Sequence, residues 1–142
     1  MNDLGRKRLM ILAGFLSHIP EHRLDMRHWI VPNFSNSIEV FYGERRYSPF
    51  LAEGLDNLLK CDTVACAAGW ACTIQEFRED GLTQSRTGSP VFGGLTAFSA
   101  LEDFFSLDLH QCEFIFRAES YLRYDSPLDV VDHINDVLEG RF

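Results

Sequence analysis

One stretch of the chain, residues 63–75, carries no charged side chain, and this feature constrains the fold more than any other. A helix that is apolar on every side has to be buried, and about a dozen residues are far too few to cross a membrane. The stretch therefore predicts a buried central helix at about residues 62–74. Asp62 or Thr63 can serve as its N-cap.

Apolar residues at helical spacing predict further helices on both sides of this segment. They cover residues 4–19, 50–60 and 95–105, a helix capped by Asp108, and a last helix with Ser126 as N-cap and Pro127 as first residue. The apolar face predicted for the last helix comprises Leu128, Val131, Ile134 and Leu138.

Two segments break the helical pattern. Residues 30–47 predict at most a short strand or an irregular arm, and the glycine-rich residues 82–94 predict a loop. Together, the patterns predict a mainly α-helical single domain over residues 1–142, with five or six helices around the central one.

Composition agrees with one globular domain. A chain of 142 residues that is 46% hydrophobic can bury a full core, which excludes intrinsic disorder. No apolar run reaches the roughly 20 residues that span a bilayer. Because the N-terminus lacks the small-residue cleavage site of a secretion signal, we expect a cytoplasmic protein without membrane contact.

Charge is distributed unevenly within the net value of −8. Residues 1–46 carry seven basic and five acidic side chains, whereas residues 47–142 carry six basic and sixteen acidic ones. This acidic balance argues against direct nucleic-acid binding, which needs an excess of Lys and Arg. In the last predicted helix, four acidic residues form one stripe: Asp129, Asp132, Asp136 and Glu139. Such a stripe is either solvated surface or a docking face for a basic partner.

Cysteines occur at Cys61, Cys66, Cys72 and Cys112, and we expect all four to be reduced thiols. Their spacing lacks the Cys-x-x-Cys pairs of structural zinc sites, so we predict no metal; a site built from Cys61 and Cys66 with Cys112 or His110 is the alternative. A thiolate at Cys61, beside the predicted helix N-terminus, is a further alternative. Because no base can be placed next to it, we assign no catalytic residue and no cofactor.

The central segment is also a candidate ligand site. Small residues lie along one side of the predicted helix, where they either let another helix approach closely or leave a pocket. The candidate pocket residues are Cys61, Thr63, Cys66 and Trp70, next to the predicted loop at 82–94.

Four segments resemble a family of small uncharacterised proteins encoded by bacteriophages and prophages, which share a Cys-x-Thr-x-x-Cys-x-x-Gly helix motif. The segments are residues 24–29, 61–71, 81–82 and 104–107, and the resemblance spans about two thirds of the chain. This chain has Asp62 where members of the family tend to have glycine. The resemblance implies a phage setting, hence the cytoplasm of the host cell, and supplies no chemistry.

Three functions follow as hypotheses. The first is a small acidic phage accessory protein that binds a host protein with a basic surface through the stripe on the last helix, for example to inhibit a defence or nucleic-acid-handling protein. The second is a protein that binds a small ligand or nucleotide signal at the central segment. The third is a metal-dependent or thiol-dependent enzyme.

Overall fold

The computed structural model describes residues 1–27, 29–31, 64–86, 88–122, 124 and 126–142. The predicted helix at residues 50–60 and the part of the predicted arm from residue 32 to 47 lie outside the described residues. In the described part, no helix has both the length and the apolar character needed to cross a membrane.

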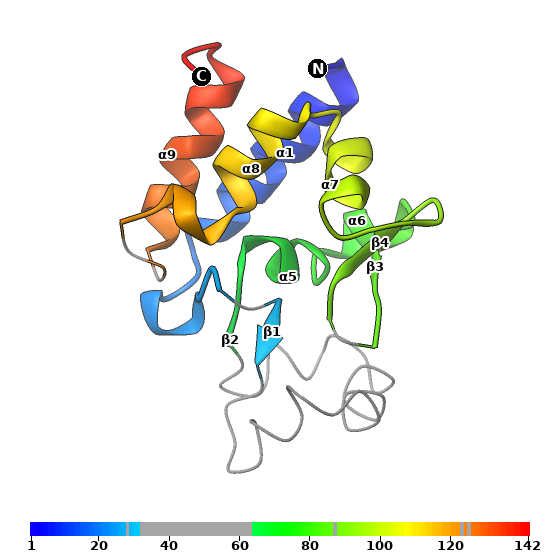
Figure 1. Cartoon of the computed structure of the whole chain (residues 1–142), viewed down its shortest axis with the longest axis horizontal. Helices are drawn as coiled ribbons and strands as arrows, with labels where there is room; N and C mark the ends of the chain where they lie inside the picture. The colour runs from blue at the N-terminus through cyan, green and yellow to red at the C-terminus, as the bar shows by residue number, and fades with distance from the viewer. Residues whose placement is uncertain (28, 32–63, 87, 123, 125) are drawn as a thin grey trace.

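The described residues form a mainly helical single domain with a small antiparallel sheet, as the sequence predicts (Figure 1). The α-helices are α1 (Asp3–Leu16), α5 (Ala67–Ala71), α6 (Gln75–Glu79), α7 (Ala97–Phe105), α8 (Leu109–Phe116) and α9 (Pro127–Leu138), and the 3-10 helices are η1 (Glu21–Arg23) and η2 (Ala118–Ser120). Strand β1 (Ile30–Val31) pairs with β2 (Val64–Ala65), and β3 (Thr83–Gln84), β4 (Pro90–Phe92) and β5 (Leu95–Thr96) form a three-stranded antiparallel sheet in that order.

Local signals in the sequence place the start of two helices, α8 and α9, correctly. The Asp108 carboxylate accepts a hydrogen bond of 2.8 Å from the Gln111 backbone N–H, and the Gln111 side chain accepts one of 3.0 Å from Asp108 N–H. This reciprocal capping box begins α8. Pro127 is the first residue of α9 as predicted, although the Ser126 side chain at the N-cap makes no capping hydrogen bond.

The buried central helix is present but much shorter than predicted. Helix α5 has five residues, and Cys66 is its N-cap, with a sulfur that accepts a hydrogen bond of 3.4 Å from Gly69 N–H. The predicted caps, Asp62 and Thr63, lie outside the described residues. The chain is extended just before α5 because β2 pairs with β1 and the Ala65 carbonyl accepts a hydrogen bond from Asp25 N–H. Hydrophobic periodicity does not reveal such long-range pairing.

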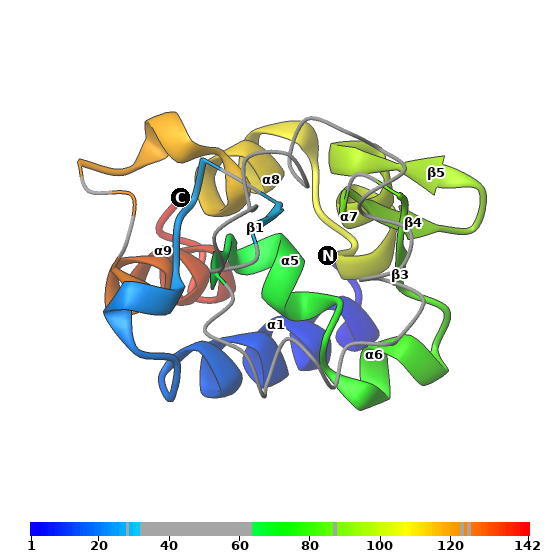
Figure 2. The same ribbon diagram turned by 90° about the horizontal axis from the view of Figure 1, so that it is seen from below.

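The core surrounds α5, which lies between α1 and α8 in Figure 2. Every residue from 65 to 72 is buried. Beside it, the Phe104 ring meets the rings of Phe77, Phe92 and Phe105 edge-on at centroid separations of 5.0–5.1 Å. The Arg8 guanidinium lies 3.9 Å from the Phe104 ring centroid and donates a 2.7 Å hydrogen bond to the Phe104 carbonyl, which ties α1 to α7.

The small-residue side of α5 receives an extended chain segment and not another helix. A Cβ atom at Gly69 would overlap the carbonyl oxygen of Trp29 and lie 2.9 Å from the Ala65 Cβ. Glycine is therefore the one residue that lets the chain leading into β1 cross directly over α5. This contact sets the position of Trp29 relative to the rest of the core.

Two predictions of local structure were wrong. The predicted loop at residues 82–94 contains β3 and β4, because main-chain pairing and packing of β4 on α7 order it. In α9, the core-facing residues are Val130, Ile134 and Val137, whereas Leu128 is 62% exposed. The helix packs against both α1 and α8, and this docking selects a face rotated from the one that spacing suggested.

Candidate functional site

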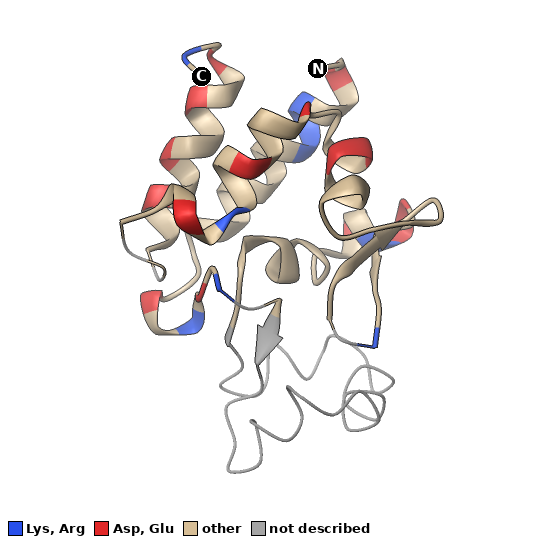
Figure 3. Cartoon of the chain, viewed as in Figure 1, with Lys and Arg blue, Asp and Glu red and all other residues tan. Residues whose placement is uncertain are grey.

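The acidic stripe lies on the outer side of α9. Because α9 buries its opposite face against α1 and α8, the carboxylates face outward: Asp132 and Glu139 are exposed, and Asp129 and Asp136 are half-buried. Figure 3 shows acidic residues along α9 in red. The structure therefore gives the predicted stripe one continuous solvent-facing surface.

One arginine divides the stripe into two halves of different charge. Arg141 donates hydrogen bonds of 2.9 and 3.1 Å to Asp136 Oδ1 and also pairs with Glu139. Asp129 and Asp132 have no ion pair or hydrogen bond with any other described side chain. The half of the stripe near the start of α9 therefore carries two uncompensated charges, whereas Arg141 offsets one of the two charges in the half near its end.

Of the four candidate ligand residues, the structure describes two, Cys66 and Trp70. Cys61 and Thr63 lie outside the described residues. Trp70 is completely buried, and its indole Nε1–H donates a 2.9 Å hydrogen bond to the Arg23 carbonyl. A side chain so enclosed fills the core and does not contact a ligand. Cys66, in contrast to Trp70, borders a cavity.

This cavity has a volume of about 360 Å³ and opens between the C-terminal end of α8, the first turn of α7 and the segment that precedes β1. The described residues that line it are Met26, Arg27, Trp29, Cys66, Phe98, Phe116, Arg117, Ala118 and Glu119. Ligand pockets typically measure about 300–1,000 Å³, so the cavity is of the size that holds a small molecule. Sequence reasoning missed most of these residues, because they come from separate segments that only the fold brings together.

The described thiols are poor nucleophiles. Burial raises the pKa of the Cys66 thiol from its ordinary 9.0 to about 11, and that of Cys112 to about 12. Burial also raises the pKa of Cys72. A reactive cysteine needs a lowered pKa and access to solvent. Cys61, the predicted thiolate, lies outside the described residues, and within these no three His, Cys, Asp or Glu side chains are grouped as metal ligands.

We expect Cys66, Cys72 and Cys112 to resist alkylation in the native protein. A pKa raised by about two units leaves about 100-fold less thiolate at pH 8, and burial blocks access further. Mass spectrometry after iodoacetamide treatment should find these three thiols unmodified without denaturant and fully modified in urea. Rapid native labelling of Cys66 would contradict the buried N-cap.

The same pKa shifts predict a loss of stability at alkaline pH. In the unfolded chain the thiols ionise near 9.0, whereas in the folded chain Cys66 keeps its proton until about pH 11. Rising pH therefore removes protons from the unfolded state first, and the free energy of unfolding should fall between about pH 9 and 11. Urea titrations at pH 8 and pH 10 would measure this difference, and equal midpoints would contradict it.

The chain matches no protein-family model, no curated protein and no solved structure. Two features of the structure bear on function: the acidic face of α9 and the cavity beside Cys66.

Proposed function

We propose that the protein is a small, phage-encoded accessory protein that acts without catalysis, by binding a host protein with a basic surface through the outer face of α9. The resemblance of four sequence segments to phage proteins supports the phage setting. The charge pattern supports the kind of partner, because clustered carboxylates attract and orient a surface of opposite sign.

The observation that carries the proposal is the way α9 is docked. Its buried residues Val130, Ile134 and Val137 face the core, where the helix packs against α1 and α8, while the acidic residues of the stripe face outward on the helix and at its C-cap. A helix fixed on its inner side presents these charges in one defined arrangement, so a partner need not order them on binding. The charges thus favour fast, salt-sensitive association.

The pairing with Arg141 identifies the part of the stripe that matters most. Asp136 and Glu139 already form ion pairs with Arg141, so a basic partner would have to compete with Arg141 and gains less electrostatic attraction from them. Asp129 and Asp132 have no such competitor among the described side chains. We therefore assign partner recognition mainly to Asp129 and Asp132.

This assignment predicts unequal effects for two matched double variants. Asp129→Asn with Asp132→Asn should reduce the association rate with the partner at least about tenfold, because two uncompensated charges are removed. Asp136→Asn with Glu139→Gln removes the same formal charge but should have a much smaller effect. Capture from host lysate followed by biolayer interferometry with the captured protein measures both rates.

Controls separate binding from folding. Both double variants should unfold at the same urea concentration as the parent protein within error, because surface charges contribute little to stability. Capture should also weaken when salt is raised from 50 to about 300 mM, as screening requires. Equal capture by the parent protein and the Asp129/Asp132 variant would overturn the proposal.

A further inference from the structure

We propose that the cavity beside Cys66 binds a small, uncharged molecule built on a flat aromatic ring with an amide-like edge. The site is separate from the acidic face of α9 and does not depend on the function proposed for that face. Its residues come from the 26–29 segment, α5, α7 and the α8–η2 junction.

The deep part of the cavity is apolar. Met26, Cys66 and Phe116 line it with exposed fractions of 5, 2 and 2%, so only a small part of each meets the cavity space. The Cys66 thiol is neutral at physiological pH, because burial raises its pKa to about 11. An apolar group that enters this space displaces water without breaking protein hydrogen bonds.

Aromatic rings form the walls. Trp29 and Phe98 meet edge-on with centroids 6.0 Å apart, and both are half-buried, so part of each ring faces the opening. Aromatic groups favour edge-to-face and offset arrangements with other rings. A flat aromatic ligand can therefore pack against Trp29 and Phe98 in an edge-to-face or offset geometry of the same kind.

The walls are held in place before any ligand arrives. The Trp29 carbonyl packs directly on Gly69, so the backbone that carries this indole cannot move inward. On the same segment, Met26 N–H donates a 2.7 Å hydrogen bond to the Tyr124 carbonyl. A preformed cavity loses little conformational entropy on binding, which favours affinity.

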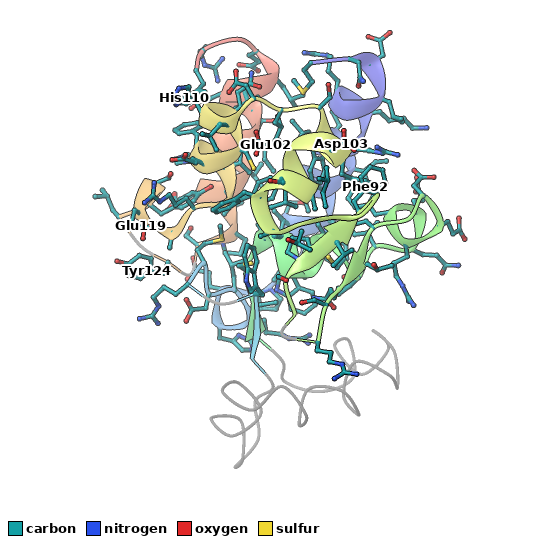
Figure 4. All side chains as sticks on the ribbon, turned by 45° about the vertical axis from the view of Figure 1, so that its right-hand side comes forward. Phe92, Glu102, Asp103, His110, Glu119 and Tyr124 are labelled. Atoms are coloured by element: carbon teal, nitrogen blue, oxygen red, sulfur yellow. The ribbon has the colours of Figure 1, made fainter. Side chains whose placement is uncertain are left out.

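The rim selects against negative charge. It holds two guanidinium groups, but Arg27 forms a bidentate pair with Asp25, and Arg117 pairs with Glu113 and Glu119. Among the described residues, these three carboxylates outnumber the two arginines, so this part of the rim offers no excess of positive charge to an anion. Figure 4 shows Glu119 at this end of the molecule, on the same side as Tyr124 and well away from Phe92.

The rim nevertheless offers a donor and an acceptor close together. Nη2 of Arg117 makes no hydrogen bond with the described residues, and the Glu119 carboxylate accepts one of 3.1 Å from Arg117 Nε with its other oxygen left to solvent. A primary amide on an aromatic ring carries the complementary acceptor and donor on one edge. Because the rim side chains are largely exposed, we expect them to tune selectivity, while the ring supplies most of the affinity.

Two isosteric probes test this proposal: naphthalene-2-carboxamide, which is neutral, and 2-naphthoate, which has the same shape and a negative charge. The readout is the indole N–H signal of each of the two tryptophans in proton–nitrogen correlation spectra of the full chain. Addition of the carboxamide should shift the Trp29 signal saturably and leave that of the fully buried Trp70 unchanged. The naphthoate should bind at least about fivefold more weakly.

Variants locate the binding. Ala118→Phe places a large ring in the cavity from a half-buried position and should abolish the shift, whereas Ser99→Phe on the exposed side of α7 should not. If Ala118→Phe fails to fold, Phe98→Leu removes one aromatic wall and should weaken binding several-fold. The Asp129/Asp132 double variant should bind the carboxamide like the parent protein, so failure of either proposal can be recognised separately.

Three results would overturn the inference. The first is an unmoved Trp29 signal at the solubility limit of the carboxamide. The second is unchanged binding by the folded Ala118→Phe or Phe98→Leu variant, which would place the probe elsewhere. The third is binding of the naphthoate as tight as that of the carboxamide, which would refute the selection for an uncharged ligand.

Discussion

Gly69→Ala should lower the free energy of unfolding by more than about 3 kcal/mol, a large fraction of the roughly 5–15 kcal/mol that stabilises an ordinary domain. The added Cβ would overlap the carbonyl oxygen of Trp29 and come within 2.9 Å of the Ala65 Cβ. A backbone carbonyl cannot rotate away like a side chain, so relief requires the segment before β1 to lift off α5. The cavity wall formed by Trp29 should be lost with it.

Gly14→Ala is the matched control for this substitution. Gly14 lies on the exposed side of α1, and a Cβ there meets no atom within 4 Å. Alanine should therefore stabilise the protein by about 1 kcal/mol through its higher helix propensity. Urea unfolding followed by circular dichroism measures both changes. A loss below about 1 kcal/mol for Gly69→Ala would mean that the chain does not cross α5 this closely.

Trp70→Ala should cost about 3–5 kcal/mol of stability, the range found when a large aromatic residue is removed from a core. The indole is completely buried, packs against Phe15 at a centroid distance of 6.2 Å and holds the Arg23 carbonyl through a 2.9 Å hydrogen bond. Its removal leaves a large void and a carbonyl without its partner. Trp70→Phe should lose less, because it keeps one ring.

Trp29→Ala is the comparison for Trp70→Ala, because the two tryptophans of the chain lie in different environments. Trp29 is half-buried and lines the cavity, so its removal should cost less stability than removal of Trp70 while eliminating carboxamide binding. The comparison requires urea unfolding of each variant and a binding titration of Trp29→Ala. A Trp70→Ala protein as stable as the parent would contradict the assignment of Trp70 to the core.

Features set by local chemistry were predictable. Asp108 begins α8 through a capping box with Gln111, and Pro127 begins α9 because its missing N–H costs nothing at that position. The acidic stripe on α9 was predictable for the same reason, since four residues at helical spacing share a face wherever the helix docks. The pairing of Arg141 with Asp136 and Glu139 was not foreseen, although the three residues are close in sequence.

The cavity was not predictable, because its parts are distant in sequence. Trp29, Phe98 and Arg117 carry no shared spacing, and each by itself is an ordinary aromatic or charged residue. The sequence suggested Trp70 because it lies in the apolar segment with Cys66. In the fold, the Trp70 side chain is enclosed in the core, whereas the Cys66 side chain lines the cavity.

The segment without charged residues, 63–75, shows which properties follow from the sequence alone and which depend on the tertiary structure. By itself the sequence determined that the middle of this segment, residues 65–72, is buried, because its side chains carry no charge to desolvate, and that the fold is mainly helical. Only tertiary structure decided that β2 precedes a five-residue α5, that α9 buries Val130 and not Leu128, and that Trp29 crosses Gly69 to wall a cavity. Burial follows from each residue's own transfer free energy, whereas strand pairing and helix docking depend on partners far along the chain.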